Sequence, residues 1–218
     1  MSTNIGAGGY HWQSEENVER WVETRRSSSP DRDEGFAAML EQLPKDLSTP
    51  LRFVDLGAGE GRVASIILDR YPNATAVLVD FSDPMMVKGD EALSRFAGRY
   101  DYLKWDMNEG DWPQELSGPY DAIVSAASLH HLHDDRKNWI TQAIADHLVS
   151  GGLYSNLDVY RNEDAVFAEE DVHSRTLATV ASALSFLDNA GFVDVVLTAR
   201  APREPQQGER ALITGRKP

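Results

Sequence analysis

The sequence predicts one doubly wound α/β domain: a seven-stranded, mostly parallel sheet with an antiparallel last strand and a small N-terminal helical cap. Strand-like apolar runs alternate with patterns of helical period along the chain, which is typical of helix-linked parallel strands. A Pro-rich turn alone joins the last two strands, so the final strand should run antiparallel. The length of 218 residues suits one core. We expect a cap at 1–48 and a sheet domain at 49–218 that form one globular unit.

The first helix should begin at Ser14, because Ser is a good N-cap and acidic residues follow it. The segment Ser27–Asp33 reads as a loop, and a second helical stripe from Phe36 should stop at Pro44. Later helices are expected up to Tyr71, over Pro84–Phe96, over Trp139–Leu148 and over Leu177–Leu187, the last with Gly191 beyond its end. Strands are expected around Phe53–Asp55 and at Ala76–Asp80, Tyr100–Trp105, Tyr120–Ser125, Leu153–Val159, Phe192–Thr198 and Arg210–Gly215.

The most informative segment reads FVDLGAGEGRVA, from Phe53 to Ala64. A buried strand ends near an acidic residue, alternate glycines form a turn too tight for side chains, and a helix follows. Such a turn lets a ligand approach the backbone, and the unpaired N–H groups of the helix end favour a negatively charged or carboxylate-bearing group. Taken alone, the pattern also fits an ordinary Gly-rich turn between a strand and a helix.

The spacing of the glycines shows which of the known nucleotide-binding motifs this segment fits. The dinucleotide fingerprint needs a glycine three residues after Gly59, where this chain has Arg62. A phosphate-binding P-loop needs Gly-Lys-Ser/Thr after a longer loop, which is absent here. The pattern Asp-x-Gly-x-Gly-x-Gly resembles motif I of class I S-adenosylmethionine (SAM) dependent methyltransferases. That resemblance implies SAM as the cofactor.

Residues at the ends of later strands extend the resemblance. Asp80 ends the second strand, where a carboxylate can accept hydrogen bonds from a ribose diol. Asp106, after the third strand, resembles the acid that accepts a hydrogen bond from the adenine amino group. The segment YDAIVSAASLHHL, from Tyr120 to Leu132, is similar to the family segment that runs beneath the sulfonium. The resemblance implies cofactor contacts by Asp55, Gly57, Ala58, Gly59, Gly61, Asp80, Phe81, Met85, Asp106, Met107 and Ser125; for Met85 a place in the core is the alternative.

The candidates for proton transfer are His130 and His131, since imidazole titrates near neutral pH and a neutral acceptor must lose a proton. The same pair is also common in the family as a structural element. The neighbouring residues His133, Asp134 and Asp135 lack helical ligand spacing and fall at the start of a helix, where Asp residues serve as caps. No metal is therefore expected.

The N-terminal region resembles the cap of small-molecule methyltransferases. Tyr10, Trp12 and Trp21 are candidate substrate-binding residues that would close over an acceptor, or they staple the first helices together. The segment Arg161–Arg175 stands where the family often inserts a longer lid. The pocket is then open or completed by a second chain, so a homodimer is one possibility.

Composition limits the partners. The formal net charge of −14 argues against nucleic acid and anionic membranes, since phosphate contacts need clustered Lys and Arg. No cysteine is present for disulfides or thiolate metal sites, no apolar run approaches the ~20 residues of a membrane span, and the N-terminus has no signal-peptide pattern. We expect a cytoplasmic protein.

The resemblance implies methyl transfer from SAM to an O, N or C atom of a small molecule. The Asn/Asp-Pro-Pro-Tyr/Phe motif of amino-methylating enzymes that act on nucleic acids or glutamine is missing at Ser125–Ser128, which favours a small acceptor. Two alternatives remain: a protein of this fold that binds SAM without methylating and performs other pocket chemistry, and a regulatory module without catalysis.

Overall fold

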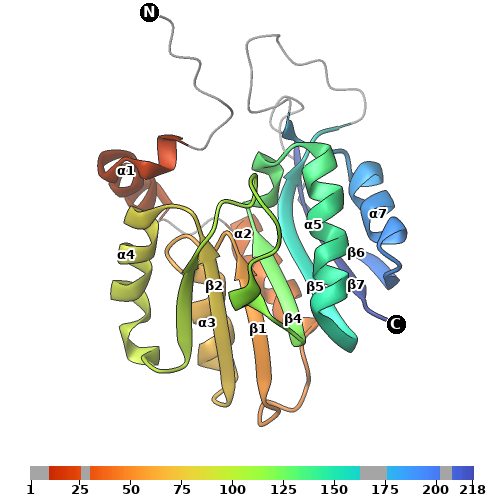
Figure 1. Ribbon diagram of the computed structural model, residues 1–218, viewed down its shortest axis with the longest axis horizontal. Helices are drawn as coiled ribbons and strands as arrows, with labels where there is room; N and C mark the ends of the chain where they lie inside the picture. Colours follow the sequence, from red (N-terminus) through yellow and green to blue (C-terminus); the bar gives the residue numbers. More distant parts are fainter. Residues whose placement is uncertain (1–9, 26–29, 163–175, 202–207) are drawn as a thin grey trace, which may run out of the picture.

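A computed structural model describes residues 10–25, 30–162, 176–201 and 208–218. Its centre is a seven-stranded sheet of order β3-β2-β1-β4-β5-β7-β6, drawn in Figure 1. The predicted fold class is confirmed. The strands are β1 (Leu51–Leu56), β2 (Ala74–Asp80), β3 (Tyr100–Lys104), β4 (Tyr120–Ala126), β5 (Leu148–Tyr160), β6 (Val193–Ala201) and β7 (Glu209–Arg216).

The directions of the strands also agree with the sequence pattern. Strand β1 pairs in parallel with β2 and β4, and the parallel pairing continues to β3 and β5. Strand β7 runs antiparallel to both of its neighbours, β5 and β6. The short connection between the last two strands therefore gives the antiparallel finish that was predicted.

Helices cover both faces of the sheet. On one face, apolar residues of α2, α3 and the end of α4 pack on the strands, for example Met39, Ile67 and Leu93. On the other face, α5 and α7 supply residues such as Ile144 and Leu187. The described helices are η1 (Tyr10–Gln13), α1 (Glu15–Arg25), α2 (Pro30–Glu41), α3 (Arg62–Arg70), α4 (Asp83–Leu93), η2 (Ser94–Phe96), η3 (Gln114–Leu116), η4 (Leu129–His131), α5 (Asp134–His147) and α7 (Val180–Asn189).

Several predicted boundaries were wrong. Helix α2 begins at Pro30, inside the predicted loop, because the fixed φ of Pro suits a first helical position. Strand β5 begins at Leu148, before the Gly151-Gly152 pair, and an irregularity in its pairing with β4 absorbs the extra residues. Helix α7 starts at Val180 because Thr179 caps it, with the Thr179 side chain accepting a hydrogen bond from the Ser182 N–H.

The two parts of the predicted cap lie in different places (Figure 1). Helix α2 packs on the sheet, with Met39 fully buried in its core. Helix α1 and the turn η1 contact α4 instead, and Val18 and Val22 pack against Met85. The η1–α1 segment therefore adjoins the carboxyl end of β2. In the part of the chain that the structure describes, no helix is both long and apolar enough to cross a membrane.

Candidate functional site

The candidate site lies at the carboxyl ends of β1 to β4. The strand order reverses between β1 and β4, and ligands of open α/β sheets bind at such a reversal. The glycine turn follows β1, Asp80 ends β2, Asp106 follows β3, and the His130-His131 turn follows β4. Most of the predicted site residues therefore lie along one edge of the sheet.

The glycines of the turn serve two different purposes. Gly57, Gly59 and Gly61 have φ values of 71°, 55° and 76°, a region that side chains disfavour. A Cβ on Gly57 would lie 1.7 Å from the Ser128 hydroxyl oxygen, and one on Gly61 would lie 2.5 Å from a Leu93 methyl carbon. A Cβ on Gly59 would have no neighbour closer than the Met85 sulfur at 3.9 Å. Gly57 and Gly61 permit close packing, whereas Gly59 presents bare backbone to open space.

The turn is held in place by the neighbouring strands. The Gly57 and Ala58 N–H groups donate to the Val79 carbonyl at 2.8 and 2.9 Å. The Gly59 N–H donates to the Asp80 carboxylate at 2.7 Å, and the Tyr102 hydroxyl donates to the Gly59 carbonyl at 2.8 Å. The Asp80 carboxylate also accepts the Ser82 N–H at 2.9 Å. Since a carboxylate offers about four lone-pair positions, Asp80 can hold this turn and still accept hydrogen bonds from a ligand.

Asp55 and Asp80 bury carboxyl groups beneath the turn. One Asp55 oxygen accepts the Ala64 N–H at 3.2 Å, and the other has no hydrogen-bond partner among the described residues. Burial raises the pKa of the Asp55 carboxyl to about 7, and the negative charge of Asp80 adds to the shift. Burial likewise raises the pKa of Asp80. A positively charged ligand would offset the cost of ionising both groups.

The predicted contacts after β2 and β3 lie in ordered turns. Phe81 accepts a hydrogen bond at its carbonyl from the Gln13 side chain at 2.8 Å. Asp106 accepts at its carboxylate from the Asn108 backbone at 2.9 Å, and Met107 is buried. Met85 packs with α1, as its alternative interpretation stated, although its sulfur also lies near the Gly59 backbone.

Serines after β4 support the glycine turn. Ser125 is fully buried and donates its hydroxyl to the Leu56 carbonyl at 2.8 Å, which ties β4 to the end of β1. Ser128 occupies the space that the missing Cβ of Gly57 leaves. The role of Ser128 was not foreseen, because its contact with Gly57 depends on how the β4 turn folds back.

His130 forms a buried pair with Asp158 of β5. The His130 Nδ1 atom lies 2.5 Å from the Asp158 carboxylate, which also accepts the His130 backbone N–H at 3.0 Å. Burial alone would raise the pKa of Asp158, but the charge and hydrogen bond of His130 bring it below its ordinary value. The His130 and His131 rings are 4.0 Å apart, and Trp12 meets His131 edge-on at 6.3 Å. The structure thus joins the predicted His pair to Asp158, which sequence reasoning missed.

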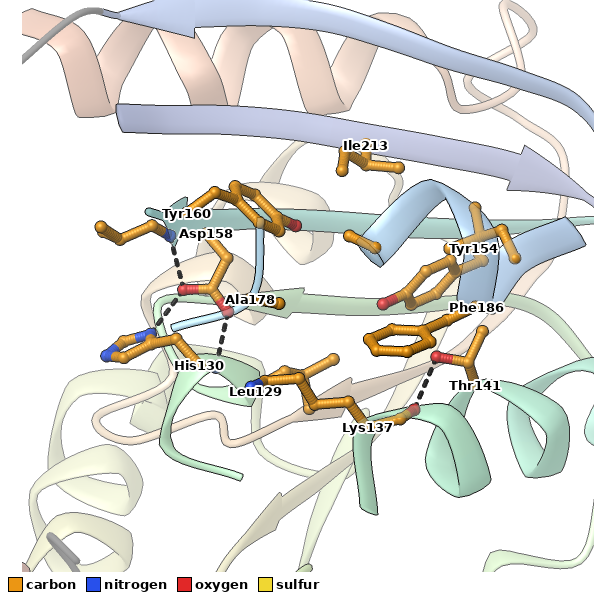
Figure 2. Close-up of a pocket in the computed structure, with 13 residues that line it drawn as sticks. Leu129, His130, Lys137, Thr141, Tyr154, Asp158, Tyr160, Ala178, Phe186 and Ile213 are labelled. Atoms are coloured by element: carbon orange, nitrogen blue, oxygen red, sulfur yellow. Dashed lines mark hydrogen bonds and ion pairs between the residues drawn. The ribbon is translucent and has the colours of Figure 1, made fainter. Parts of the chain in front are cut away.

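A small cavity lies behind this pair, between β5, α5 and α7 (Figure 2). Its volume is about 30 Å³, and a water needs only ~10–15 Å³ of such space. His130, Asp158, Lys137, Tyr154 and Phe186 are among its walls, and none of its lining residues comes from the glycine turn. It has room for a water or two, and it shares His130 with the candidate site.

Some predictions fall outside the described residues. The side chains of Tyr10 and Trp21 and most of the segment Arg161–Arg175 are among them. Trp12 is half-buried beside His131, and its carbonyl accepts a hydrogen bond from the Ser82 hydroxyl. In the described ranges, no cluster of three or more His, Cys, Asp or Glu side chains could hold a metal ion.

Comparisons with known proteins agree with this arrangement. Residues 54–154 match a family model described as a methyltransferase domain. Trans-aconitate 2-methyltransferase of Streptomyces avermitilis is 35% identical over 121 residues, which cover 54% of this chain and 42% of that protein. The chain therefore spans less than half the length of this curated relative.

Solved structures share the fold at low sequence identity. PigF with SAH has a TM-score of 0.69 and 20% identity, over 95% of this chain and 61% of PigF. Human N-acetylserotonin methyltransferase in complex with SAM has a TM-score of 0.65 and 19% identity, over 94% of this chain and 57% of the human chain. The sheet order and the solved structures show that the chain has the fold of SAM-dependent methyltransferases. Residues 54–154, just under half of the chain, match the methyltransferase family model, so the predicted resemblance is confirmed.

Proposed function

We propose that the protein transfers the methyl group of SAM to a small-molecule acceptor. The observation that carries this proposal is the glycine turn, where the Gly59 backbone faces open space beside the buried carboxyl groups of Asp55 and Asp80. Bare backbone and nearby acid groups suit a ligand that carries a nucleoside and a positive charge. The family match of residues 54–154 supports the same reaction class.

We assign each of these residues a role in binding the cofactor. Gly59 and its neighbours Ala58 and Gly61 would admit the cofactor, Asp80 would accept hydrogen bonds from the ribose hydroxyls, and Asp106 would accept one from the adenine amino group. When bound, SAM supplies an electrophilic methyl group. The protein's own part is to orient that group and to exclude water, which lowers the barrier through fixed geometry.

An acceptor that must lose a proton would place it on the imidazole pair. His131 is half-buried between Trp12 and His130, and Asp158 fixes the orientation of the His130 ring. Trp12, with Tyr10 and Trp21, is proposed to border the acceptor.

We propose that the acceptor of the methyl group is a small molecule. The relative from Streptomyces avermitilis is named for a small organic acid. The net charge of −14 disfavours nucleic acid and anionic membranes as partners. The cytoplasmic location and a homodimer remain predictions. The competing interpretation is a SAM-binding protein that does not methylate.

Calorimetric titration of the purified chain with SAM, and separately with NADH, tests the cofactor assignment. We expect micromolar SAM binding and no NADH binding. Gly59→Asn should abolish SAM binding without unfolding the protein, because Asn tolerates positive φ while its side chain fills the open space. The matched control is Gly98→Asn, since Gly98 also has a positive φ (83°) but lies before β3, at the opposite end of that strand.

Wild-type affinity for SAM in Gly59→Asn would refute the proposed site. A second measurement addresses turnover: mass spectrometry should detect S-adenosylhomocysteine (SAH) formed in equal amount with a methylated product from a panel of small acids, phenols and amines. SAM that binds but is never consumed across that panel would favour the non-methylating alternative.

A further inference from the structure

One arginine outside the predicted motifs holds the loop that carries Asp106. Arg136 lies in the first turn of α5, some thirty positions after this loop in the sequence. Its guanidinium donates to the Met107 carbonyl, to the Glu109 carbonyl at 3.2 Å and to the Gly110 carbonyl at 2.8 Å. A single side chain thus binds three backbone carbonyls of the segment 107–110.

The guanidinium is itself held in place. It stacks on the Trp139 ring with its central carbon 4.0 Å from the ring centroid. The Trp105 indole donates to the same Glu109 carbonyl at 3.1 Å, so two side chains converge on one acceptor. Such a planar fork with several fixed donors is a property of Arg that Lys does not share.

The loop is the one that orients Asp106. The Asp106 carboxylate accepts from the Asn108 backbone and side chain at 2.9 and 3.1 Å, and its carbonyl accepts the Glu109 N–H at 3.0 Å. The direction of the Asp106 carboxylate therefore depends on the path of residues 107–110. Arg136 fixes that path through its hydrogen bonds to the backbone carbonyls of this segment.

We propose that Arg136 is a positioning residue for recognition of the adenine base: it holds the 107–110 loop so that Asp106 points at the exocyclic amino group. The proposal rests on the proposed function, since it assumes that the cofactor's adenine lies at Asp106. Arg136 does not itself touch the ligand. Replacing it should therefore reduce selectivity for the base more than it reduces binding of the remainder of the cofactor.

The experiment compares two ligands that differ only at this amino group: SAH and its purine-riboside analogue, in which a hydrogen atom replaces the amino group. Calorimetry should show that the wild-type protein prefers SAH by about tenfold, the value of one well-placed hydrogen bond to a charged group. In Arg136→Lys the preference should fall to about twofold or less, because one ammonium cannot replace three directed N–H donors.

Arg99 provides a matched control at the other end of β3. Its guanidinium also donates to three backbone carbonyls, those of Leu68, Tyr71 and Pro72, at 3.0 to 3.1 Å, and it lies over the Phe96 ring. It precedes β3, whereas the Asp106 loop follows that strand. Arg99→Lys should lower the melting temperature but leave the SAH preference unchanged.

Amide hydrogen exchange tests the effect of Arg136 on the 107–110 loop without any ligand. The Asn108 and Glu109 amides, which are bonded to Asp106, should exchange faster in Arg136→Lys by about tenfold, and should be unchanged in Arg99→Lys. If Arg136→Lys does not fold, Trp139→Leu removes the stacking partner and should produce a smaller shift of the same kind in both measurements.

The outcomes separate this inference from the proposed function. Unchanged SAH preference and unchanged amide exchange in a folded Arg136→Lys protein would overturn the inference alone. A wild-type protein that binds both ligands equally would also overturn it. A wild-type protein that binds neither SAH nor SAM would refute the proposed function, and the inference would fall with it.

Discussion

At the scale of single residues, Asp55 is the most unusual acid of the site. It is 1% exposed, and its only described hydrogen bond comes from the Ala64 N–H. Burial raises its pKa from 3.8 to about 7 in the folded protein. Folding therefore favours the protonated form, and ionising Asp55 costs stability.

The stability of the free protein should consequently fall as pH rises. The contribution of Asp55 is fully present below pH 4 and is lost between about pH 4 and 7, because the folded state holds the proton more tightly than the unfolded chain does. Asp55→Asn keeps an acceptor for the Ala64 N–H without the titration. We expect it to be more stable than wild type at pH 8 by about 2–3 kcal/mol.

Urea unfolding from pH 5 to pH 8 measures this effect. The control is Asp101→Asn, which removes an exposed carboxylate from β3 and should leave the slope against pH unchanged. A difference between wild type and Asp55→Asn that does not grow with pH would contradict the assignment of the raised pKa to Asp55.

At the scale of elements, helix α4, strand β3 and the glycine turn meet at one tyrosine. The Tyr102 hydroxyl donates to the Gly59 carbonyl, and a Cβ on Gly89 of α4 would lie only 1.8 Å from that hydroxyl oxygen. Gly89 is buried within the helix. The missing side chain at Gly89 therefore makes room for the tyrosine that supports the turn.

Gly89→Ala should destabilise the protein despite the better helix propensity of Ala. The gain of ~1 kcal/mol in propensity is outweighed by overpacking against Tyr102, which costs ~1–3 kcal/mol. SAM affinity should fall as well, since the Gly59 carbonyl loses its donor when Tyr102 moves. Thermal unfolding and calorimetry measure the two effects.

Tyr102→Phe separates the hydrogen bond from the packing. It should weaken SAM binding while it lowers stability by only ~1 kcal/mol. In the double variant Gly89→Ala/Tyr102→Phe, stability should recover in part, because the closest contact is gone while the ring carbon at 2.6 Å remains. A Gly89→Ala protein as stable as wild type would show that α4 shifts freely at this point.

The same elements show how far the sequence predicts the structure. Hydrophobic period and turn residues predict the strands, their directions and the glycine turn, because these depend on neighbours in the chain. The boundaries at Pro30 and Leu148 were predicted wrongly. Pro30 fits a loop as well as the first position of a helix, and Leu148 fits the end of a helix as well as the start of a strand, so packing decides in both cases.

The site could be predicted in part for a similar reason. Motif residues such as Gly59 and Asp80 lie at or just after the ends of strands, and the hydrophobic pattern of the sequence predicts where those strands end. Their supports, such as Asp158 and Arg136, lie 26 or more positions from the groups they bind and carry no local signal. Only the folded chain brings them together.

At the scale of the whole molecule, the net charge of −14 acts on the cofactor and its product differently. SAM carries a sulfonium in addition to its amino-acid charges and is a net cation, whereas SAH has lost that positive charge and is neutral overall. The negative field of the protein should attract the first and leave the second unaffected. Above about pH 7, where Asp55 is ionised, the buried acid groups at Asp55 and Asp80 add to the field at the site itself.

Salt should therefore weaken SAM binding and leave SAH binding nearly constant. Raising NaCl from about 0.02 M to about 0.5 M shortens the Debye length from roughly 20 Å to about 4 Å, so the field at the entrance is screened. We expect the ratio of the SAH to the SAM dissociation constant to fall by about threefold or more. Calorimetry at four salt concentrations, with SAH as the internal control, measures the ratio.

Equal salt dependence of the two ligands would mean that the charge lies too far from the glycine turn to act on the cofactor. A falling ratio would assign the acidic surface a function, since it would speed the replacement of neutral product by cationic cofactor after each turnover.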